Sequence, residues 1–359
     1  MEKIQTIGYG ASGSLIGGKT LEPMKFERNA PKEDEVLIDV LYCGVCHSDI
    51  HQVDNDWKNT IYPCVPGHEI IGTIKSAGSA VTKFKVGDTV GVGCMIDSCG
   101  HCNPCKEGEE QFCEGPVAET MTYNGYWKPD GTDFNTFGGF SNNLVVRESF
   151  VLRIPENLKI SAAAPILCAG VTTFSPLKHW GVKEGHHVGI IGIGGLGHMA
   201  VKLAKAMGAT VTAITTKEEK REAALALGAD DVLVSDDKDA MAANESKFDF
   251  MLCTIPESFD VNLYIPLMRR RGSLVTVGLL GPYAEPTNNM LVASKARSIG
   301  GSLIGGIAET QEVLDFCAEH QILPDVQMIN IQDINDAFDQ IKDEEVRFRY
   351  VIDMDSLKA

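Results

Sequence analysis

The pattern of hydrophobic and polar positions divides the 359-residue chain into two parts with different periodicity. Up to about residue 155, short runs such as VLIDVLYC and NNLVVRESFVLRIP alternate apolar and polar residues between turns rich in Gly, Pro and Asp. Alternation with a period of two is typical of half-buried strands in antiparallel sheets. This part of the chain is therefore predicted to be mostly β structure.

From about residue 159 the pattern becomes an apolar run, a glycine turn and a helix-like segment, repeated along the chain. HHVGIIGI precedes GLGHMAVKLAKAMG, TVTAIT precedes KEEKREAALALGA, and DVLVS, FDFMLCTI and GSLVTVGLL follow. Strands that alternate with helices are typical of a parallel, doubly wound sheet. We therefore predict a Rossmann domain over residues 159–298.

After residue 298 the chain returns to mixed elements and ends with the strand-like FRYVIDM. We expect this last strand to rejoin the β-rich part. The predicted fold class is thus α/β, with a Rossmann domain (159–298) inserted in a β-rich domain made of residues 1–158 and 299–359.

Composition and charge exclude several classes of function. The formal net charge is −17 and no basic block is present, which argues against nucleic acid or an anionic membrane as a partner. The apolar stretch HHVGIIGIGGLGHMAVKLAKAMGA contains many glycines and two lysines, so it indicates a strand, turn and helix rather than a membrane span. The N-terminus, MEKIQTIGYGASG, does not resemble a secretion signal, and we expect a cytoplasmic protein.

In a reducing compartment, the eleven cysteines are expected to be metal ligands, catalytic groups or small buried residues. Four of them follow the spacing C-x2-C-x2-C-x7-C in CGHCNPCKEGEEQFC: Cys99, Cys102, Cys105 and Cys113. Four thiolates so spaced can surround one zinc ion and leave no open coordination position. The first three spacings also resemble an iron–sulfur motif, but the fourth cysteine lies too far along the chain and no proline follows it. We predict a structural zinc site.

A second set of candidate metal-ligating residues is scattered along the chain: CGVCHSDIH offers Cys46, His47, Ser48 and His51, PGHE offers His68 and Glu69, and LCAGVTT offers Cys168. Two thiolates and one imidazole leave zinc an open position, where the metal can polarise a carbonyl or acidify an alcohol. Taken singly, each residue has a simpler explanation. A lone buried cysteine is usually a small hydrophobic residue, and a lone histidine usually forms ordinary hydrogen bonds.

The motif GIGGLG, with Gly192, Gly194 and Gly197, follows an apolar strand and opens a helix. This is the context of the dinucleotide-binding fingerprint. Gly194 would let a pyrophosphate approach the backbone, and Gly197 would let helix and sheet pack closely. The alternative is a tight turn that binds no ligand.

In sequence order, GVCHSDIH, PGHE, the four-cysteine loop, CAGVTTFSPL and GIGGLGHMAVKLAKAMGA resemble the zinc-dependent medium-chain alcohol dehydrogenases. EKREAALALGADDVL and GGSLIGGIAETQEVLDFCAEH resemble the branch of cinnamyl alcohol dehydrogenases and bacterial aldehyde reductases. The resemblance covers nearly the whole chain and implies a GroES-like catalytic domain. It also implies two zinc ions, one on the four cysteines and a catalytic one on Cys46, His68 and Cys168, with Glu69 able to approach the metal.

The resemblance implies roles for further residues. Ser48, in place of the threonine common in this branch, and His51 would form a proton relay, and Asp56 would either orient His51 or be a solvated acid. The implied coenzyme-binding residues are His47, Thr172, Gly192, Gly194, Gly195, Leu196, Gly197, Thr215, Thr216, Lys217, Lys220, Arg221, Thr254, Val277, Gly278 and Ser302. The implied substrate pocket, whose soft and apolar wall favours aromatic or medium-length aliphatic aldehydes over sugars, consists of Trp57, Cys94, Met121, Leu303 and Ile304.

The choice of coenzyme depends on the residues after TVTAIT. An NAD-binding fold usually has Asp or Glu about 20 residues beyond the glycine motif, whereas Thr216 occupies that place here. Hydroxyl groups at Thr215 and Thr216 can donate to a 2′-phosphate, and nearby basic residues can supply opposing charge. Two alternatives remain: Thr216 and Glu219 fit a helix capping box, and Glu218 or Glu219 could reach the ribose. We predict NADP(H).

These inferences predict a zinc-dependent oxidoreductase that transfers a hydride between NADP(H) and a primary alcohol or aldehyde, and that reduces a broad range of aromatic and aliphatic aldehydes. The alternatives are an NAD-dependent polyol or alcohol dehydrogenase acting in the oxidative direction and a non-catalytic cofactor-binding sensor or structural protein. The resemblance, together with the edge-strand-like SIGGSLIGG, also predicts a homodimer.

Overall fold

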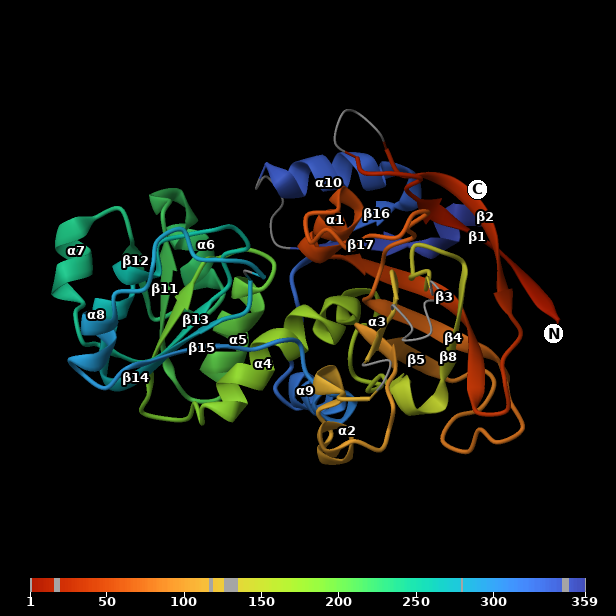
Figure 1. Ribbon diagram of the computed structural model, residues 1–359, viewed down its shortest axis with the longest axis horizontal. Helices are drawn as coiled ribbons and strands as arrows, with labels where there is room; N and C mark the ends of the chain where they lie inside the picture. Colours follow the sequence, from red (N-terminus) through yellow and green to blue (C-terminus); the bar gives the residue numbers. More distant parts are fainter. Residues whose placement is uncertain are drawn as a thin grey trace. The chain divides into compact units, whose positions relative to one another are not determined.

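The computed structural model describes residues 2–15, 20–115, 119–125, 135–278, 280–343 and 349–358. The chain forms two compact units (Figure 1): unit 1 is Met1–Cys168 with Gly305–Ala359, and unit 2 is Ala169–Ile304. Both junctions lie later in the chain than the predicted 158/159 and 298/299. The reason is that the turn η3 (Ala164–Leu167) packs on strands of unit 1, whereas β15 (Ser298–Gly301) pairs with a strand of unit 2.

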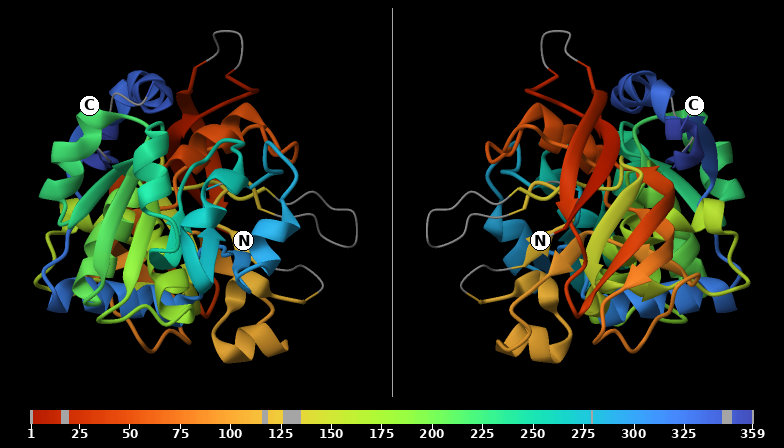
Figure 2. Two further views of the ribbon diagram at one scale, coloured as in Figure 1. Left: turned by 90° about the vertical axis from the view of Figure 1, so that its left-hand side faces the viewer. Right: turned by 90° about the vertical axis from the view of Figure 1, so that its right-hand side faces the viewer.

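Unit 2 contains a six-stranded parallel sheet with helices beside it (Figure 2), and its strand order is β12-β11-β10-β13-β14-β15. This is the order of a Rossmann fold, which reverses its direction between β10 and β13. The strands are β10 (His187–Ile191), β11 (Thr210–Thr215), β12 (Asp231–Val234), β13 (Phe248–Cys253), β14 (Met268–Thr276) and β15. The helices are α4 (Ala169–His179), α5 (Gly197–Ala206), α6 (Arg221–Ala226), α7 (Lys238–Ala243) and α8 (Asn289–Ala293), with short turns η4 (Glu218–Lys220), η5 (Val261–Leu263) and η6 (Ile265–Leu267).

The central strands of unit 2 are nearly continuous apolar runs because both faces of a parallel sheet are covered. All residues of β10 after His187 are buried, and β13 has one half-buried position in six. Most residues of helix α5 are buried, among them Met199, Val201 and Leu203. The segments predicted from periodicity therefore form the core of this unit, and the predicted doubly wound sheet is confirmed.

Unit 1 is built on a seven-stranded sheet in the order β16-β17-β3-β4-β5-β9, in which β8 also pairs with β3. β17 runs antiparallel to β3, with Tyr350 opposite Val45, so the last strand rejoins the N-terminal part as predicted. The strands are β3 (Glu35–Val45), β4 (Ile70–Ala77), β5 (Thr89–Val92), β8 (Asn143–Arg147), β9 (Leu152–Arg153), β16 (Val326–Asn330) and β17 (Arg349–Asp353). Two small antiparallel pairs are β1 (Lys3–Gly10) with β2 (Glu22–Asn29), and β6 (Met95–Asp97) with β7 (Thr120–Met121).

Unit 1 also contains helices and short helical turns outside this sheet. They are α1 (His47–Asp54), α2 (Asn103–Glu107), α3 (Ile160–Ala163), α9 (Ile307–Glu319) and α10 (Ile334–Lys342), with turns η1 (Glu110–Phe112), η2 (Glu148–Phe150), η7 (Ile331–Asp333) and η8 (Met354–Lys358). Among the described residues, no single helix is long and apolar enough to cross a membrane; Ile160–Leu167 and Ala169–His179 meet that test only as a bent pair, by length and composition alone.

Candidate active site

Four side chains able to ligate a metal meet in unit 1: Cys46, His68, Glu69 and Cys168. One donor atom from each lies within 4.8 Å of the others, and all four residues are buried. Nε2 of His68 lies 3.2 Å from Sγ of Cys168. Two thiols and an imidazole at this spacing fit the three-ligand set of a catalytic zinc ion.

The sheet of unit 1 brings these donors together. Cys46 follows β3 and is the N-cap of α1, while His68 and Glu69 directly precede β4. Because β3 and β4 are antiparallel, with Cys43 opposite Ile70, the end of one strand meets the start of the other. Cys168 follows η3, which packs against β3, β4 and β5. Residues 100 positions apart in the chain, His68 and Cys168, are thus held at one end of one sheet.

Asp49, which the sequence analysis did not select, orients the histidine of this cluster. Its Oδ1 atom lies 3.1 Å from Nδ1 of His68 and accepts from the N–H of Gly67 at 3.0 Å, and its Oδ2 accepts from the N–H of Cys46 at 2.9 Å. The residue has no exposed surface. A carboxylate on the far nitrogen of a ligating histidine fixes the ring and leaves the other nitrogen for the metal. The signal in the sequence was an acid three residues after Cys46.

A buried ion pair joins Glu69 to Arg349 of β17, a second residue that the sequence analysis missed. Burial raises the pKa of Glu69 to about 7, although the charge of Arg349 opposes this shift. Oε2 of Glu69 is buried and has no hydrogen-bond partner among the described residues. A Cβ atom on Gly44 would lie 1.9 Å from this oxygen, so only glycine fits beside it. Oε2 of Glu69 thus lies close to the donor atoms of Cys46, His68 and Cys168 and is not engaged by the described residues. This fits the expectation that Glu69 can approach a metal.

The predicted relay residues lie on and after α1. Oγ of Ser48 lies 3.6 Å from Sγ of Cys46. Nδ1 of His51 lies 2.7 Å from Oδ2 of Asp56, so this acid does contact the imidazole. The rings of His47 and His51 are 4.7 Å apart. The helix therefore carries a hydroxyl and an imidazole one turn apart, starting beside the ligand set.

The residues predicted to form the substrate pocket belong to both units. Trp57 lies next to His51, with ring centroids 5.8 Å apart. Cys94 is buried, and its carbonyl accepts from the N–H of Thr122 at 2.9 Å, which places Met121 beside it. In unit 2, Leu303 is 37% exposed, and Ile304 is buried with a left-handed φ of 39°. Within unit 1, Trp57 thus neighbours the predicted relay residue His51, and Met121 neighbours Cys94.

The four-cysteine loop forms a second, closed donor set. Donor atoms of Cys99, Cys102, Cys105 and Cys113 all lie within 4.8 Å of one another. The N–H of Cys102 donates to Sγ of Cys99 at 3.3 Å, and the N–H of Gly115 to Sγ of Cys113 at 3.4 Å. Donation from backbone N–H groups of residues 101 and 102 lowers the pKa of Cys99 to about 6. Four thiols that converge in this way fit a tetrahedral zinc ion with no open position.

In unit 2, the glycine motif has the geometry that a close approach requires. Gly192 has a φ of 87°, and a Cβ on Gly197 would lie 1.9 Å from its carbonyl oxygen. A Cβ on Gly194 would meet nothing within 4 Å, so the backbone there is open. Thr254 Oγ1 donates to the carbonyl of Gly192 at 3.0 Å and fixes the turn.

Several of the remaining predicted coenzyme residues lie in this turn or follow the carboxyl ends of parallel strands in unit 2. Gly195 and Leu196 complete the motif, and the carbonyl of Gly195 accepts from Nδ1 of His198 at 2.9 Å. Val277 and Gly278 follow β14, and Ser302 follows β15, with its N–H donating to Thr276 at 3.2 Å. Thr172 is buried in α4. Ligands of open α/β sheets bind outside this end of the strands.

The segment after β11 does not form the capping box of Thr216 and Glu219 that was the alternative interpretation. The turn η4 begins at Glu218 with Lys217 as its N-cap, and no side chain caps it. The buried Thr215 accepts from the N–H of Lys217 at 3.2 Å, whereas Thr216 is exposed.

Arg221 is already engaged in this segment. Its Nη2 donates to Oε2 of Glu218 at 3.0 Å and its Nη1 to the carbonyl of Val232 at 3.1 Å. The ion pair therefore holds both Arg221 and Glu218. Thr216 precedes the turn η4 and Lys220 is its last residue.

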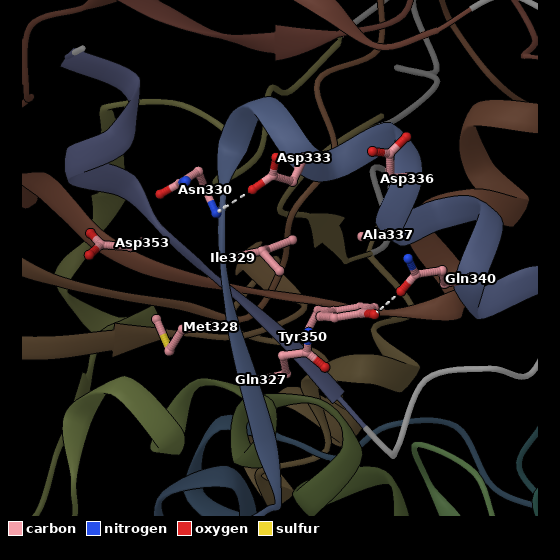
Figure 3. A pocket seen from close by; sticks show the side chains of 10 residues that line it. All are labelled: Gln327, Met328, Ile329, Asn330, Asp333, Asp336, Ala337, Gln340, Tyr350 and Asp353. Atoms are coloured by element: carbon pink, nitrogen blue, oxygen red, sulfur yellow. Dashed lines mark hydrogen bonds between the residues drawn. The ribbon is translucent and has the colours of Figure 1, made fainter.

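A surface hollow of about 420 Å³ lies elsewhere in unit 1, along β16 and α10 (Figure 3). The N–H of Asn330 donates to Asp333 at 3.3 Å, and the hydroxyl of Tyr350 donates to Gln340. None of the residues that line the hollow belongs to either cysteine-containing donor set.

Comparisons with known proteins cover the same two parts of the chain. Residues 32–156 match the alcohol dehydrogenase GroES-like domain family, and residues 195–319 match the zinc-binding dehydrogenase family. The chain is 49% identical over 346 residues to aldehyde reductase YahK of Escherichia coli (strain K12), covering 96% of this chain and 97% of that one. It is 47% identical to the NADP-dependent alcohol dehydrogenase C 1 of Mycolicibacterium smegmatis, covering 92% of this chain and 94% of that one.

Solved structures give the same picture. A cinnamyl alcohol dehydrogenase from Sorghum bicolor superposes with a TM-score of 0.92 at 39% identity, over 98% of each chain. The CAD from Helicobacter pylori complexed with NADP(H) superposes with a TM-score of 0.90 at 40% identity, over 99% of each chain.

Proposed function

Because the chain belongs to the zinc-binding medium-chain alcohol dehydrogenases and is an oxidoreductase of alcohols and aldehydes, we propose that it is an NADP(H)-dependent reductase of a broad range of aromatic and medium-length aliphatic aldehydes. The observation that carries the proposal is the buried cluster of Cys46, His68 and Cys168, with Asp49 behind the histidine. Three ligands held in this way leave a fourth position for substrate.

The two donor sets are assigned separate metals. Cys46, His68 and Cys168 would hold a catalytic zinc ion, and the four-cysteine loop a structural one. When bound, zinc supplies a Lewis acid that polarises a carbonyl oxygen, and NADPH supplies the hydride. The unpaired oxygen of Glu69 supports its approach to the first metal during turnover.

The chain's own residues would move the proton. The Ser48 hydroxyl, next to Cys46, would donate to the oxygen of the product. His51 would then return a proton toward Ser48. Since Asp56 accepts from Nδ1 of His51, Nε2 is the atom left to exchange protons.

The preference for NADP(H) is proposed from the segment after β11. Thr216 is exposed where an NAD-binding fold usually has an acid, and Lys217 and Lys220 follow it. The relative from Mycolicibacterium smegmatis is named as NADP-dependent, and the Helicobacter pylori structure is a complex with NADP(H). We expect Thr216 and Lys220 to face the 2′-phosphate, and Arg221 to contribute less because Glu218 holds it.

A second candidate is a dehydrogenase that oxidises polyols with NAD. The observation that favours it is the 45% identity of the chain to a probable mannitol dehydrogenase from Medicago sativa. Two assays distinguish the aldehyde reductase from the polyol dehydrogenase. One measures NADPH oxidation with aromatic, aliphatic and sugar aldehydes, and the other measures NAD reduction with mannitol. Our proposal expects turnover of the first two aldehyde classes and fails if only the polyol reacts.

We also propose a homodimer that works in the cytoplasm. Within the described residues β15 lies at the end of the six-stranded sheet, and pairing it with a second copy would cover its open backbone groups. Leu280 and Met290, exposed by 53% and 73%, lie in the segment between β14 and β15. Sedimentation at micromolar concentration would reveal a monomer if this is wrong. The thiols of both donor sets favour a reducing compartment.

A further inference from the structure

Helix α1, which carries the predicted relay residues Ser48 and His51, ends in a left-handed turn. The residue that follows the helix, Asn55, has a φ of 63° and a ψ of 35°. Its N–H donates to the carbonyl of Gln52 at 3.1 Å, and the N–H of Asp56 donates to the carbonyl of His51 at 3.0 Å. These two bonds form a Schellman motif, which requires a left-handed residue at the position of Asn55.

The backbone bond from Asp56 to His51 brings the side chains of these two residues together. In many Schellman motifs this bond is accompanied by an apolar contact between the residue after the left-handed one and the last turns of the helix. Here the contact is polar, because Oδ2 of Asp56 lies 2.7 Å from Nδ1 of His51. The turn that ends α1 therefore places a carboxylate against the imidazole of the relay.

The attraction between these two side chains is too weak to hold them together by itself. The side chain of Asp56 is 47% exposed and that of His51 is 23% exposed. Water competes for a carboxylate at this exposure, and exposed pairs of this kind contribute little to stability. The position of the Asp56 carboxylate therefore depends on the backbone before it, whose direction is set by the conformation of Asn55.

The loop after Asp56 has attachments of its own. Nε2 of Gln52 donates to Oδ1 of Asn59 at 3.0 Å and to Oγ1 of Thr60 at 2.7 Å. Oδ1 of Asn55 accepts from the N–H of Thr60 at 3.0 Å. Because Gln52 also holds this end of the loop, the side-chain bond of Asn55 is the less important of its two contributions. The more important one is the left-handed turn directly before Asp56.

We propose that Asn55 is a positioning residue for the proton relay: its left-handed conformation holds Asp56 against Nδ1 of His51 and so keeps Nε2 available for proton exchange. A ring without this contact is free to rotate and to change its tautomer, which removes Nε2 from the path for part of the time. This inference rests on the proposed function, since it assumes that His51 returns a proton toward the product during aldehyde reduction.

The test measures kcat for the reduction of one aromatic aldehyde by NADPH in the zinc-loaded enzyme. Asn55→Ala disfavours the left-handed conformation, whereas Asn55→Gly permits it, and both variants lose the bond to Thr60. We expect kcat to fall about three- to tenfold in Asn55→Ala and to recover to within about twofold of the wild type in Asn55→Gly. Lys58→Ala is the matched control and should keep the wild-type kcat, because Lys58 also has a left-handed φ, 59°, in the same loop but lies outside the motif.

A double variant shows whether Asn55 acts through Asp56. Asp56→Ala should lower kcat by itself, and adding Asn55→Ala should lower it no further, because the contact that Asn55 positions is already lost. If Asn55→Ala instead lowers kcat by the same factor with and without Asp56, its role is structural and the inference is wrong. A wild-type kcat in Asp56→Ala would contradict the inference as well.

Equal losses of kcat in Asn55→Gly and Asn55→Ala would overturn the inference, because they would assign the effect to the side chain of Asn55. So would a wild-type kcat in Asn55→Ala. If Asn55→Ala does not fold, Asn55→Gln, which keeps an amide but favours the left-handed conformation less, takes its place in both comparisons. A wild-type kcat in His51→Ala contradicts the proposed relay itself, whereas a loss in His51→Ala with unaltered Asn55 variants contradicts only the role of Asn55.

Discussion

Nδ1 of His68 lies 3.1 Å from Oδ1 of Asp49, and the carboxylate is itself held by the N–H groups of Cys46 and Gly67. The side chain of Asp49 cannot rotate without breaking all three contacts. Because it engages Nδ1, the other ring nitrogen faces the thiol of Cys168, 3.2 Å away. Asp49 thus sets the ring orientation of His68, the predicted ligand.

Asp49→Asn should weaken zinc binding at the catalytic site by about 10- to 100-fold, because the variant loses the charge that orients His68. Competition with a chromogenic chelator would measure the affinity. Asp39→Asn, at an exposed acid paired with Lys75, serves as the matched control and should leave the affinity unchanged. Equal zinc affinities in the two variants would show that Asp49 does not contribute to zinc binding.

The two metal sites should have separable roles. Cys168→Ala is expected to abolish turnover while the fold persists, because it removes one of only three ligands of the open site. Cys102→Ala is expected chiefly to lower the melting temperature and the solubility, because it opens the closed site. Zinc content, kcat and thermal unfolding of both variants check this. Full activity in Cys168→Ala would contradict the catalytic assignment.

The proton relay predicts an order of effects. Ser48→Ala should lower kcat by about 100-fold, since the hydroxyl acts next to the reacting oxygen, and His51→Ala by about tenfold, since water can replace an outer member. Measurements of kcat at several pH values around neutrality distinguish the effect of Ser48→Ala from that of His51→Ala. The relay is excluded if Ser48→Ala retains wild-type kcat throughout that range.

Arg349→Met should destabilise the folded protein by about 3–5 kcal/mol, because it leaves the buried Glu69 without its cation. The pKa of Glu69, already raised to about 7 by burial, should then rise further. A raised folded-state pKa means that the folded protein binds the proton more tightly than the unfolded one, so stability falls as pH increases. Urea unfolding should therefore show the variant more stable at pH 6 than at pH 8.

The double variant Arg349→Met with Glu69→Gln is the control for this prediction. It has no charge at either position, so the added pH dependence should disappear and part of the lost stability should return. A single variant as stable as the wild type at pH 8 would show that the ion pair does not compensate the burial of Glu69.

Much of the architecture was predictable from the sequence because its signals are local. Alternation in VLIDVLYC predicts β3, the continuous apolar run HHVGIIGI predicts β10, and the glycines beside it indicate the turn that Gly197 closes. The convergence of Cys46, His68 and Cys168 was implied by resemblance, since no local pattern joins a residue before β4 to one after η3.

The residues that were missed depend on distant partners. Arg349 and Glu69 are 280 positions apart, and they meet only because β17 pairs with β3. The available signal was an arginine at the start of the apolar strand RYVID, which requires a charge partner if it is buried. The capping box of Thr216 and Glu219 is absent because the helical turn begins only at Glu218.

Coenzyme choice gives the most direct test of the central claim, that the chain is an NADP(H)-dependent aldehyde reductase. The measurement is the ratio of kcat/KM for NADPH to that for NADH with one aromatic aldehyde, in the wild type and in Thr216→Asp. We predict a wild-type ratio above about 10, and a fall of at least tenfold in Thr216→Asp because the new carboxylate repels the 2′-phosphate. Lys220→Ala should shift the ratio in the same direction, and Arg221→Ala by less. A wild-type enzyme that already prefers NADH would contradict the account.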